Sequence, residues 1–141
     1  MQAATSQIAE TTDAVQIIAR VASASRQIRE RYADLIRVML STAPHDQAVA
    51  GQYSTATAVR RAALVPIAER LARLGALRPG ADVAYAAEVL WFYFGYTWYF
   101  TLVDDNGWSN QRAEHWLSDQ ARRELLSPPV SSGVGCTCVS G

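Results

Sequence analysis

The chain has 141 residues, of which 50% are hydrophobic and 18% are charged, and 13 basic residues balance 13 acidic ones. This composition excludes wholesale disorder, because so many apolar side chains can bury a core, and the length predicts a single domain. The net charge is zero, whereas a domain that binds nucleic acid is usually clearly basic. All the basic residues are arginine, which excludes chemistry that needs a lysine, such as Schiff-base formation.

The two ends of the chain differ in composition from the middle. Residues 1–12 lack the basic start and apolar run of a secretory signal, so we predict a flexible N-terminal segment and a cytoplasmic protein. Residues 127–141 are rich in Ser, Pro and Gly and are predicted to form a disordered tail. Cys136 and Cys138 lie there without the further ligands that zinc needs. We expect a helical domain over 13–126, with no metal and no other cofactor.

Apolar residues recur at three- and four-residue intervals through the first half of this domain, which indicates helices. The first helix is predicted from Asp13, as N-cap, to Ser41. The second is predicted from Asp46 to Gly75, which has the features of a C-cap. Pro66 lies in its middle and predicts a kink or a short break at Val65.

The third stretch begins at Asp82 as N-cap and stops at Asn106-Gly107. Ten of its twelve residues from Val89 to Phe100 are apolar or aromatic, but the uncharged run is shorter than the roughly 20 residues of a membrane span. We predict a helix that is apolar all round and must be covered on every side. A last helix is predicted over Asn110–Leu126, capped by Ser109. No strand is predicted, so the fold class is all-α.

A small four-helix monomer cannot easily cover the whole circumference of such a third helix. A projection at about 100° per residue places Trp91, Phe94 and Trp98 on one side of this helix. It places Phe92, Tyr96, Tyr99 and Val103 on the other side. One face would meet the core or a ligand, and the other a second subunit. A homodimer formed through the last two helices is therefore predicted, with a mid-helix glycine allowing close approach. The predicted dimer interface comprises Phe92, Gly95, Tyr96, Tyr99, Val103, Trp116 and Leu117.

The segment Leu-Val-Asp-Asp-Asn-Gly-Trp-Ser, residues 102–109, resembles the end of TetR-family transcriptional regulators. Three further segments and two pairs of residues extend the resemblance over 13–126: Arg29–Leu35, Arg70–Gly80, Ala86–Trp91, Trp116-Leu117 and Leu125-Leu126. The resemblance implies an antiparallel helical bundle that binds an effector in a mostly apolar pocket. It also implies that the last two helices of each subunit form a four-helix interface in the dimer.

The family reads DNA through an N-terminal helix-turn-helix, which needs at least roughly 20 residues. Only residues 1–12 precede the first matched helix, and they contain no basic residue. The sequence leaves three alternatives open: a fragment, a truncated or mis-called gene product, or a stand-alone protein that dimerises without reading DNA. In each case we expect no DNA binding by this chain alone.

Arg60 is the strongest candidate for ligand binding, because it falls on an apolar stripe where a guanidinium needs an acidic partner. The alternatives are an ion pair with Glu88 or Glu69, or a side chain that reaches the surface. Tyr53 is expected either to line the same ligand cavity as Arg60 or to belong to the core. Trp91, Phe94 and Trp98 likewise form an aromatic pocket for a ligand or plain core.

The remaining polar residues indicate no catalytic or metal site. His45 and His115 stand alone, and no nucleophile motif or carboxylate pair is present. Asp104 and Asp105 are expected to pair with Arg112 or with an arginine of a partner subunit, or to be exposed.

The sequence thus predicts a non-enzymatic, effector-sensing and homodimerisation domain of a TetR-like regulator, taking a small apolar or acidic effector. The alternative is a stand-alone module that forms heterodimers with full-length relatives, and a small helical enzyme is the least supported class.

Overall fold

The computed structural model describes residues 13–128, and every regular element in this range is helical. The all-α class is therefore confirmed. The predictions for residues 1–12 and for the tail over 129–141, with Cys136 and Cys138, lie outside the described residues. Ser127 of the predicted tail is described, and its backbone N–H donates to the carbonyl of Ala76 at 3.1 Å, so it belongs to the fold. Among the described helices, none combines the length and hydropathy that a membrane crossing requires. The elements are α2 (Ala14–Thr42), α3 (Gln47–Arg73), α4 (Val83–Phe94), α5 (Thr97–Phe100), the π-helix η1 (Thr101–Asp105) and α6 (Asn110–Leu125).

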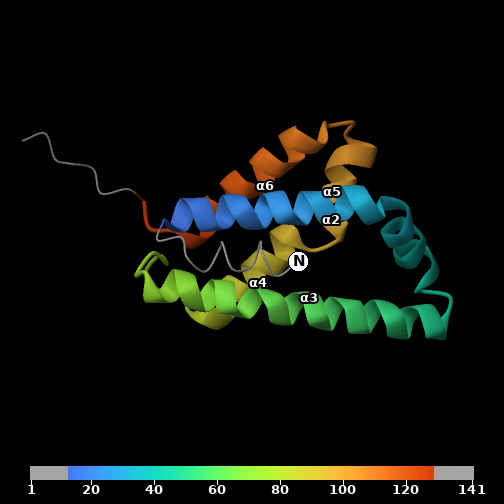
Figure 1. The fold of residues 1–141 in the computed structure, drawn as a ribbon, viewed down its shortest axis with the longest axis horizontal. Helices are drawn as coiled ribbons and strands as arrows, with labels where there is room; N and C mark the ends of the chain where they lie inside the picture. Colours follow the sequence, from blue (N-terminus) through green and yellow to red (C-terminus); the bar gives the residue numbers. More distant parts are fainter. Residues whose placement is uncertain (1–12, 129–141) are drawn as a thin grey trace, which may run out of the picture.

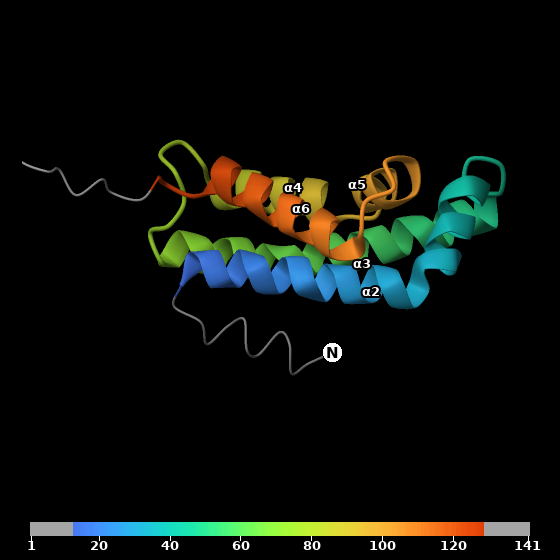
Figure 2. The same cartoon turned by 90° about the horizontal axis from the view of Figure 1, so that it is seen from above.

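The long helices pack in two layers (Figures 1 and 2). Helices α2 and α3 run antiparallel in one layer, and α4 and α6 form the other, as the view in Figure 2 shows. Helix α3 packs against α4, and α2 packs against α6, so each long helix contacts two neighbours around one core. The core is built from apolar side chains of all four long helices and of the α5–η1 segment, among them Ile17, Ile18, Leu64, Leu71, Leu90, Phe94, Phe100, Leu117 and Leu125.

All four predicted helix starts are confirmed, each by a side chain that accepts a hydrogen bond from a free backbone N–H. Asp13 accepts from Val15 at 2.9 Å, and Asp82 accepts from Tyr85 at 2.8 Å. Asp46 and Ser109 cap α3 and α6 in the same way. An N-cap of this kind stabilises a helix by about 1 kcal/mol. These starts depend on local sequence, which explains why they could be predicted.

The predicted break at Pro66 is wrong, because α3 continues through it as a single helix. Proline removes the hydrogen bond to the carbonyl of Ala62, but Ala62, Val65 and Pro66 are all exposed. Water can therefore satisfy that carbonyl. The irregularity lies in α2 instead, where Tyr32 leaves helical backbone angles (φ −116°, ψ 20°) and the helix turns toward α3 (Figure 1).

The prediction of one continuous third helix is also wrong, because the chain leaves helical geometry at Gly95 (φ −72°, ψ −163°). A Cβ atom at this position would lie 2.5 Å from the carbonyl oxygen of Trp91, so the turn requires glycine. The chain then continues as α5 and η1. The projection that grouped Tyr99 with Phe92 therefore fails after Gly95: Tyr99 is buried in the core, while Phe92 is 51% exposed.

One end of the bundle is closed by contacts between the α3–α4 connection and the end of α6. Gly75 ends α3 with a positive φ of 65°, which confirms the predicted C-cap. Leu77 then pairs with Leu126 in an isolated β-bridge. Arg78 strengthens the closure, because its backbone N–H donates to the carbonyl of Leu125 at 2.8 Å and its guanidinium pairs with Glu124 at 2.7 Å.

We predict that Gly95→Ala destabilises the protein by about 1–3 kcal/mol, because the new methyl group collides with the backbone of Trp91. Gly51→Ala is the matched control, since Gly51 lies in α3 with open space around its Cβ position. The control gains helix propensity and is expected to stabilise by about 0.5–1 kcal/mol. Urea unfolding of the three proteins measures both effects. Equal effects of the two substitutions would contradict the steric reason for Gly95.

Candidate functional site

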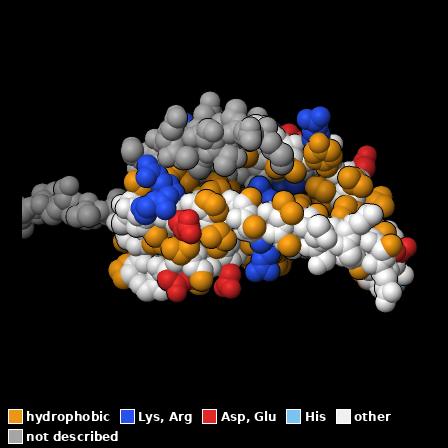
Figure 3. Space-filling model, turned by 60° about the horizontal axis from the view of Figure 1, so that its bottom comes forward, with side chains coloured by type: hydrophobic (Ala, Val, Ile, Leu, Met, Phe, Trp, Pro, Cys, Tyr) orange, Lys and Arg blue, Asp and Glu red, His pale blue; other side chains and the backbone are white. Residues whose placement is uncertain are grey.

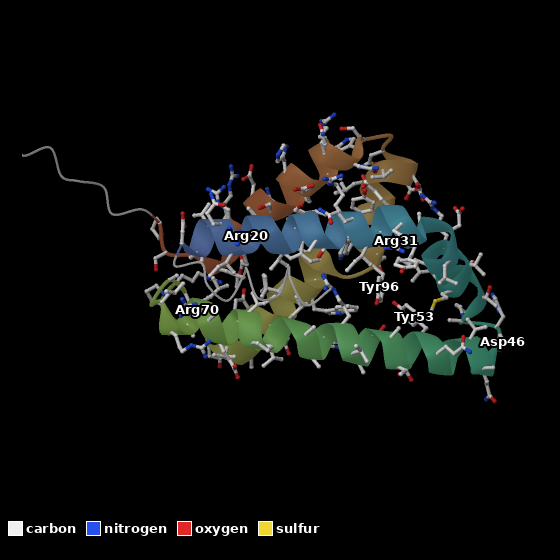
Figure 4. All side chains as sticks on the ribbon, viewed as in Figure 1. Arg20, Arg31, Asp46, Tyr53, Arg70 and Tyr96 are labelled. Carbon is white, nitrogen blue, oxygen red and sulfur yellow. The ribbon has the colours of Figure 1, made fainter. Side chains whose placement is uncertain are left out.

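An apolar cavity of about 170 Å³ lies between α2, α3 and the segment that joins α4 to α5. This volume is close to that of a cavity of roughly 150 Å³ that can hold one benzene ring. Tyr53 of α3 and Tyr96 point into this region from facing sides (Figure 4), with ring centroids 6.0 Å apart. The lining residues are Ile28, Tyr32, Leu35, Ile36, Met39, Tyr53, Ala56 and Tyr96.

Tyr96 owes its position to the helix break at Gly95. Its ring contacts that of Trp91 edge to face, with centroids 5.7 Å apart, and so forms one wall of the cavity. Burial raises the pKa of Tyr96, although the positive charge of Arg60 partly opposes this. The hydroxyl is therefore neutral near pH 7 and can donate a hydrogen bond.

Arg60 extends from α3 toward α2, and its Nη2 donates to the hydroxyl of Ser25 at 2.5 Å. The alternative ion pairs with Glu69 and Glu88 are absent from the described part of the chain, and both glutamates are exposed. Burial lowers the pKa of Arg60. Arg60 is thus a half-buried cation whose hydrogen-bond acceptor is a neutral hydroxyl.

Sequence reasoning missed a second buried arginine, Arg29, which is only 2% exposed. Its Nε donates to the backbone carbonyl of Ser25 at 3.1 Å, and its guanidinium lies 4.4 Å from the centroid of the Tyr99 ring. Its Nη1 is buried without a hydrogen-bond partner, and the described residues offer it no ion pair. The sequence did contain the signal, because Arg29 follows Ala22 and Ser25 on the buried stripe of α2.

The charge of Arg29 is costly where it lies. Burial lowers its pKa to about 10, and repulsion from Arg60 contributes to the same shift. The change from the ordinary value of 12.5 corresponds to roughly 3 kcal/mol against the charged form. Two cations, the buried Arg29 of α2 and the half-buried Arg60 of α3, therefore meet at Ser25 and have hydrogen-bond donors without acceptors among the described residues. Such an arrangement can bind an anion.

A second, more polar recess of about 430 Å³ lies on the other side of Arg29. Arg29 and Tyr99 line it together with Arg37, whose guanidinium makes two hydrogen bonds of 2.8 Å to Asp104 of η1. Of the three alternatives for Asp104 and Asp105, the pairing with Arg112 is not formed, because Arg112 stacks on Trp108. Both aspartates are exposed, as the third alternative expected, and Asp104 pairs with Arg37. The hydrogen bonds from Arg37 lower the pKa of Asp104.

The structure brings only some of the predicted ligand-binding residues together. Tyr53 lines the cavity and Arg60 lies next to it, one helical turn beyond Ala56. Trp91 contacts the cavity through Tyr96, but Phe94 is part of the core and Trp98 is 45% exposed. The predicted aromatic pocket of Trp91, Phe94 and Trp98 is thus not formed by these three side chains.

The residues of the predicted dimer interface are also divided. Phe92 and Trp116 are exposed, whereas Tyr99 and Leu117 are buried in the core of the single chain. Gly95 is buried at the turn after α4, Tyr96 lines the cavity, and Val103 is half-buried beside Arg29 and Arg37. Trp98 joins Phe92 on the surface, with ring centroids 5.2 Å apart.

The surface carries no strong charge of one sign on the described part of the face in Figure 3, where hydrophobic, basic and acidic side chains alternate. The described residues also contain no group of His, Asp or Glu side chains suited to a metal ion. No model of a known protein family, no curated protein and no solved structure matches the chain. The resemblance to TetR regulators therefore stays a prediction.

We predict that Arg29→Met raises the stability of the unliganded protein by about 1–3 kcal/mol, because an apolar chain of similar length replaces an unpaired buried charge. Arg26→Met, one turn earlier on α2, is the control and should lower stability, since Arg26 pairs with Glu114 of α6. Thermal unfolding at neutral pH measures both. A loss of stability in Arg29→Met equal to that of the control would show that the charge is balanced in the folded protein.

Proposed function

We propose that this chain is the effector-sensing and homodimerisation domain of a TetR-like transcriptional regulator. The observation that supports this proposal most is the apolar cavity between α2 and α3, walled by Tyr53 and Tyr96 and adjoining Arg60. Ligand sites in helical bundles commonly lie between helices and combine apolar walls with a few polar groups. The resemblance of residues 102–109 to the end of TetR-family regulators adds the regulatory role.

The effector is proposed to be small and largely apolar. A cavity of about 170 Å³ accommodates roughly one aromatic ring with a short substituent. Apart from the tyrosine hydroxyls, its lining offers mainly hydrocarbon surface. A binder would stabilise the folded state by mass action, by about 2.7 kcal/mol at 100 times its dissociation constant.

The homodimer is proposed to form through the layer of α4 and α6. Phe92 and Trp98 expose 51% and 45% of their surface beside the end of α4, and Trp116 exposes 42% on α6. The ring of Trp116 packs on Trp108, which fixes it at the surface. Large exposed aromatic groups of this kind mark interaction surfaces, and aromatic residues are enriched in the buried centre of interfaces.

We predict that 3-phenylpropan-1-ol, a neutral probe with one ring, raises the melting temperature of the protein. Ala56→Phe fills the cavity and should abolish the shift, whereas Ala58→Phe places the same ring on the exposed face of α3 and should leave it unchanged. Differential scanning fluorimetry measures the shift. An equal response of both variants would show that the alcohol binds outside the cavity.

We predict a dimer by light scattering at micromolar concentrations, and Phe92→Glu together with Trp98→Glu should convert it to a monomer that remains helical. Val59→Glu is the control, because Val59 is an exposed hydrophobic residue of α3, outside the layer of α4 and α6. A monomeric parent protein would contradict self-association. Capture of a full-length relative by such a monomer would favour the heterodimer alternative.

We also expect no DNA binding by this chain alone, given its zero net charge. A gel shift at low salt tests this.

A further inference from the structure

Arg29 and Arg60 approach one another from the two helices that form the cavity. Both donate to Ser25, Arg29 to its carbonyl and Arg60 to its hydroxyl, and neither has a carboxylate partner among the described residues. Their mutual repulsion also contributes to the lowered pKa of Arg29. We infer that the effector is an acid, and that Arg29 and Arg60 hold its carboxylate next to Ser25. This inference rests on the proposed function of the cavity.

The donors left over at this point suit a carboxylate. Among the described residues, the buried Nη1 of Arg29 has no acceptor, and Arg60 makes one hydrogen bond, to the Ser25 hydroxyl. A carboxylate has two oxygens that accept several hydrogen bonds between them, and an arginine binds them in a planar, paired geometry. Its negative charge would also replace the repulsion between the two arginines by attraction to a shared group.

The helix register places this group directly beside the cavity. On α3, Tyr53, Ala56 and Arg60 follow one another along one face, and the first two line the cavity. On α2, Ser25 and Arg29 precede Tyr32 in the same way. Because the helices are antiparallel and Ser25 is bonded to Arg60, a ligand ring between Tyr32 and Tyr53 would direct a short acidic chain toward both arginines.

The cavity and the arginines together define the chemical class of the ligand. The apolar walls exclude a second charged group at the ring end, because it would be buried without a partner. The volume admits about one ring. The ligand class that fits is therefore a small arylalkanoic acid with one carboxylate on a short chain.

The test compares 3-phenylpropanoate with 3-phenylpropan-1-ol by isothermal titration calorimetry at neutral pH. We expect the acid to bind at least tenfold more tightly than the alcohol. Arg60→Met and Arg29→Met should each bring the ratio of the two affinities close to one while preserving binding of the alcohol. Arg73→Met is the control, because it removes an exposed positive charge at the end of α3 and should leave the ratio unchanged.

Each outcome decides between distinct explanations. Equal affinities of acid and alcohol in the parent protein would overturn the acid inference and leave the proposed effector cavity intact, whereas binding of neither probe would overturn both. Titration with sodium phosphate and with sodium chloride tests whether the two arginines bind an inorganic anion instead of the carboxylate of a ligand. If either anion binds through Arg29 and Arg60 and does not compete with 3-phenylpropanoate, the arginines serve a separate anion and the acid inference fails. Circular dichroism of each variant verifies that it is folded.

Discussion

The hydrogen bond from Arg60 to Ser25 joins α2 and α3 near the buried Arg29, so that two positive charges, one of them only half-buried, lie close together between these helices. In the register that this hydrogen bond joins, Tyr32 of α2 and Tyr53 of α3 both line the cavity between the two helices. Buried cations without acidic partners are destabilising, so evolution usually removes or pairs them. The acidic ligand proposed here would supply the negative charge that the two arginines lack among the described residues.

The second layer contacts Arg29 through the ring of Tyr99. The turn at Gly95 directs α5 inward, so that the Tyr99 ring stacks on Arg29. Ion pairs at the edges then hold this layer on α2, from Arg26 to Glu114 and from Arg37 to Asp104. The pair of Arg26 with Glu114 is half-buried, whereas the pair of Arg37 with Asp104 is exposed. An exposed ion pair contributes at most about 1 kcal/mol, so the second pair orients the layer more than it stabilises it.

This arrangement connects the cavity to the surface proposed for dimerisation. Tyr96 directly precedes α5 and Tyr99 lies within it, while Trp98, between them in the chain, is exposed. One segment of a few residues therefore contacts the cavity, a buried arginine and the solvent-exposed aromatic surface. A ligand that alters the position of Arg29 would act on the same segment that the proposed dimer interface uses.

The sequence predicted what local residues determine. The helix starts at Asp13, Asp46, Asp82 and Ser109 follow from short-range capping, and the fold class follows from helical periodicity. The cavity was only partly predictable: Tyr53 and Arg60 were identified, because an arginine on an apolar stripe stands out. Arg29 was missed although it shows the same signal.

The break at Gly95 was missed because a glycine within an apolar run is compatible with a helix until the tertiary packing decides. The pairing of Arg37 with Asp104 joins residues far apart in the chain, and no local pattern indicates it. The division of aromatic side chains between core, cavity and surface depends on both. It therefore could not be read from a projection of one continuous helix.

A crystal structure of the protein with 3-phenylpropanoate tests the role of the buried arginines most directly. The expected result is a ring in the cavity between Tyr32 and Tyr53, and a carboxylate within hydrogen-bond distance of Arg29 and Arg60. A ligand bound with its carboxylate in solvent, or bound away from the cavity while both arginines keep their present contacts, would contradict it.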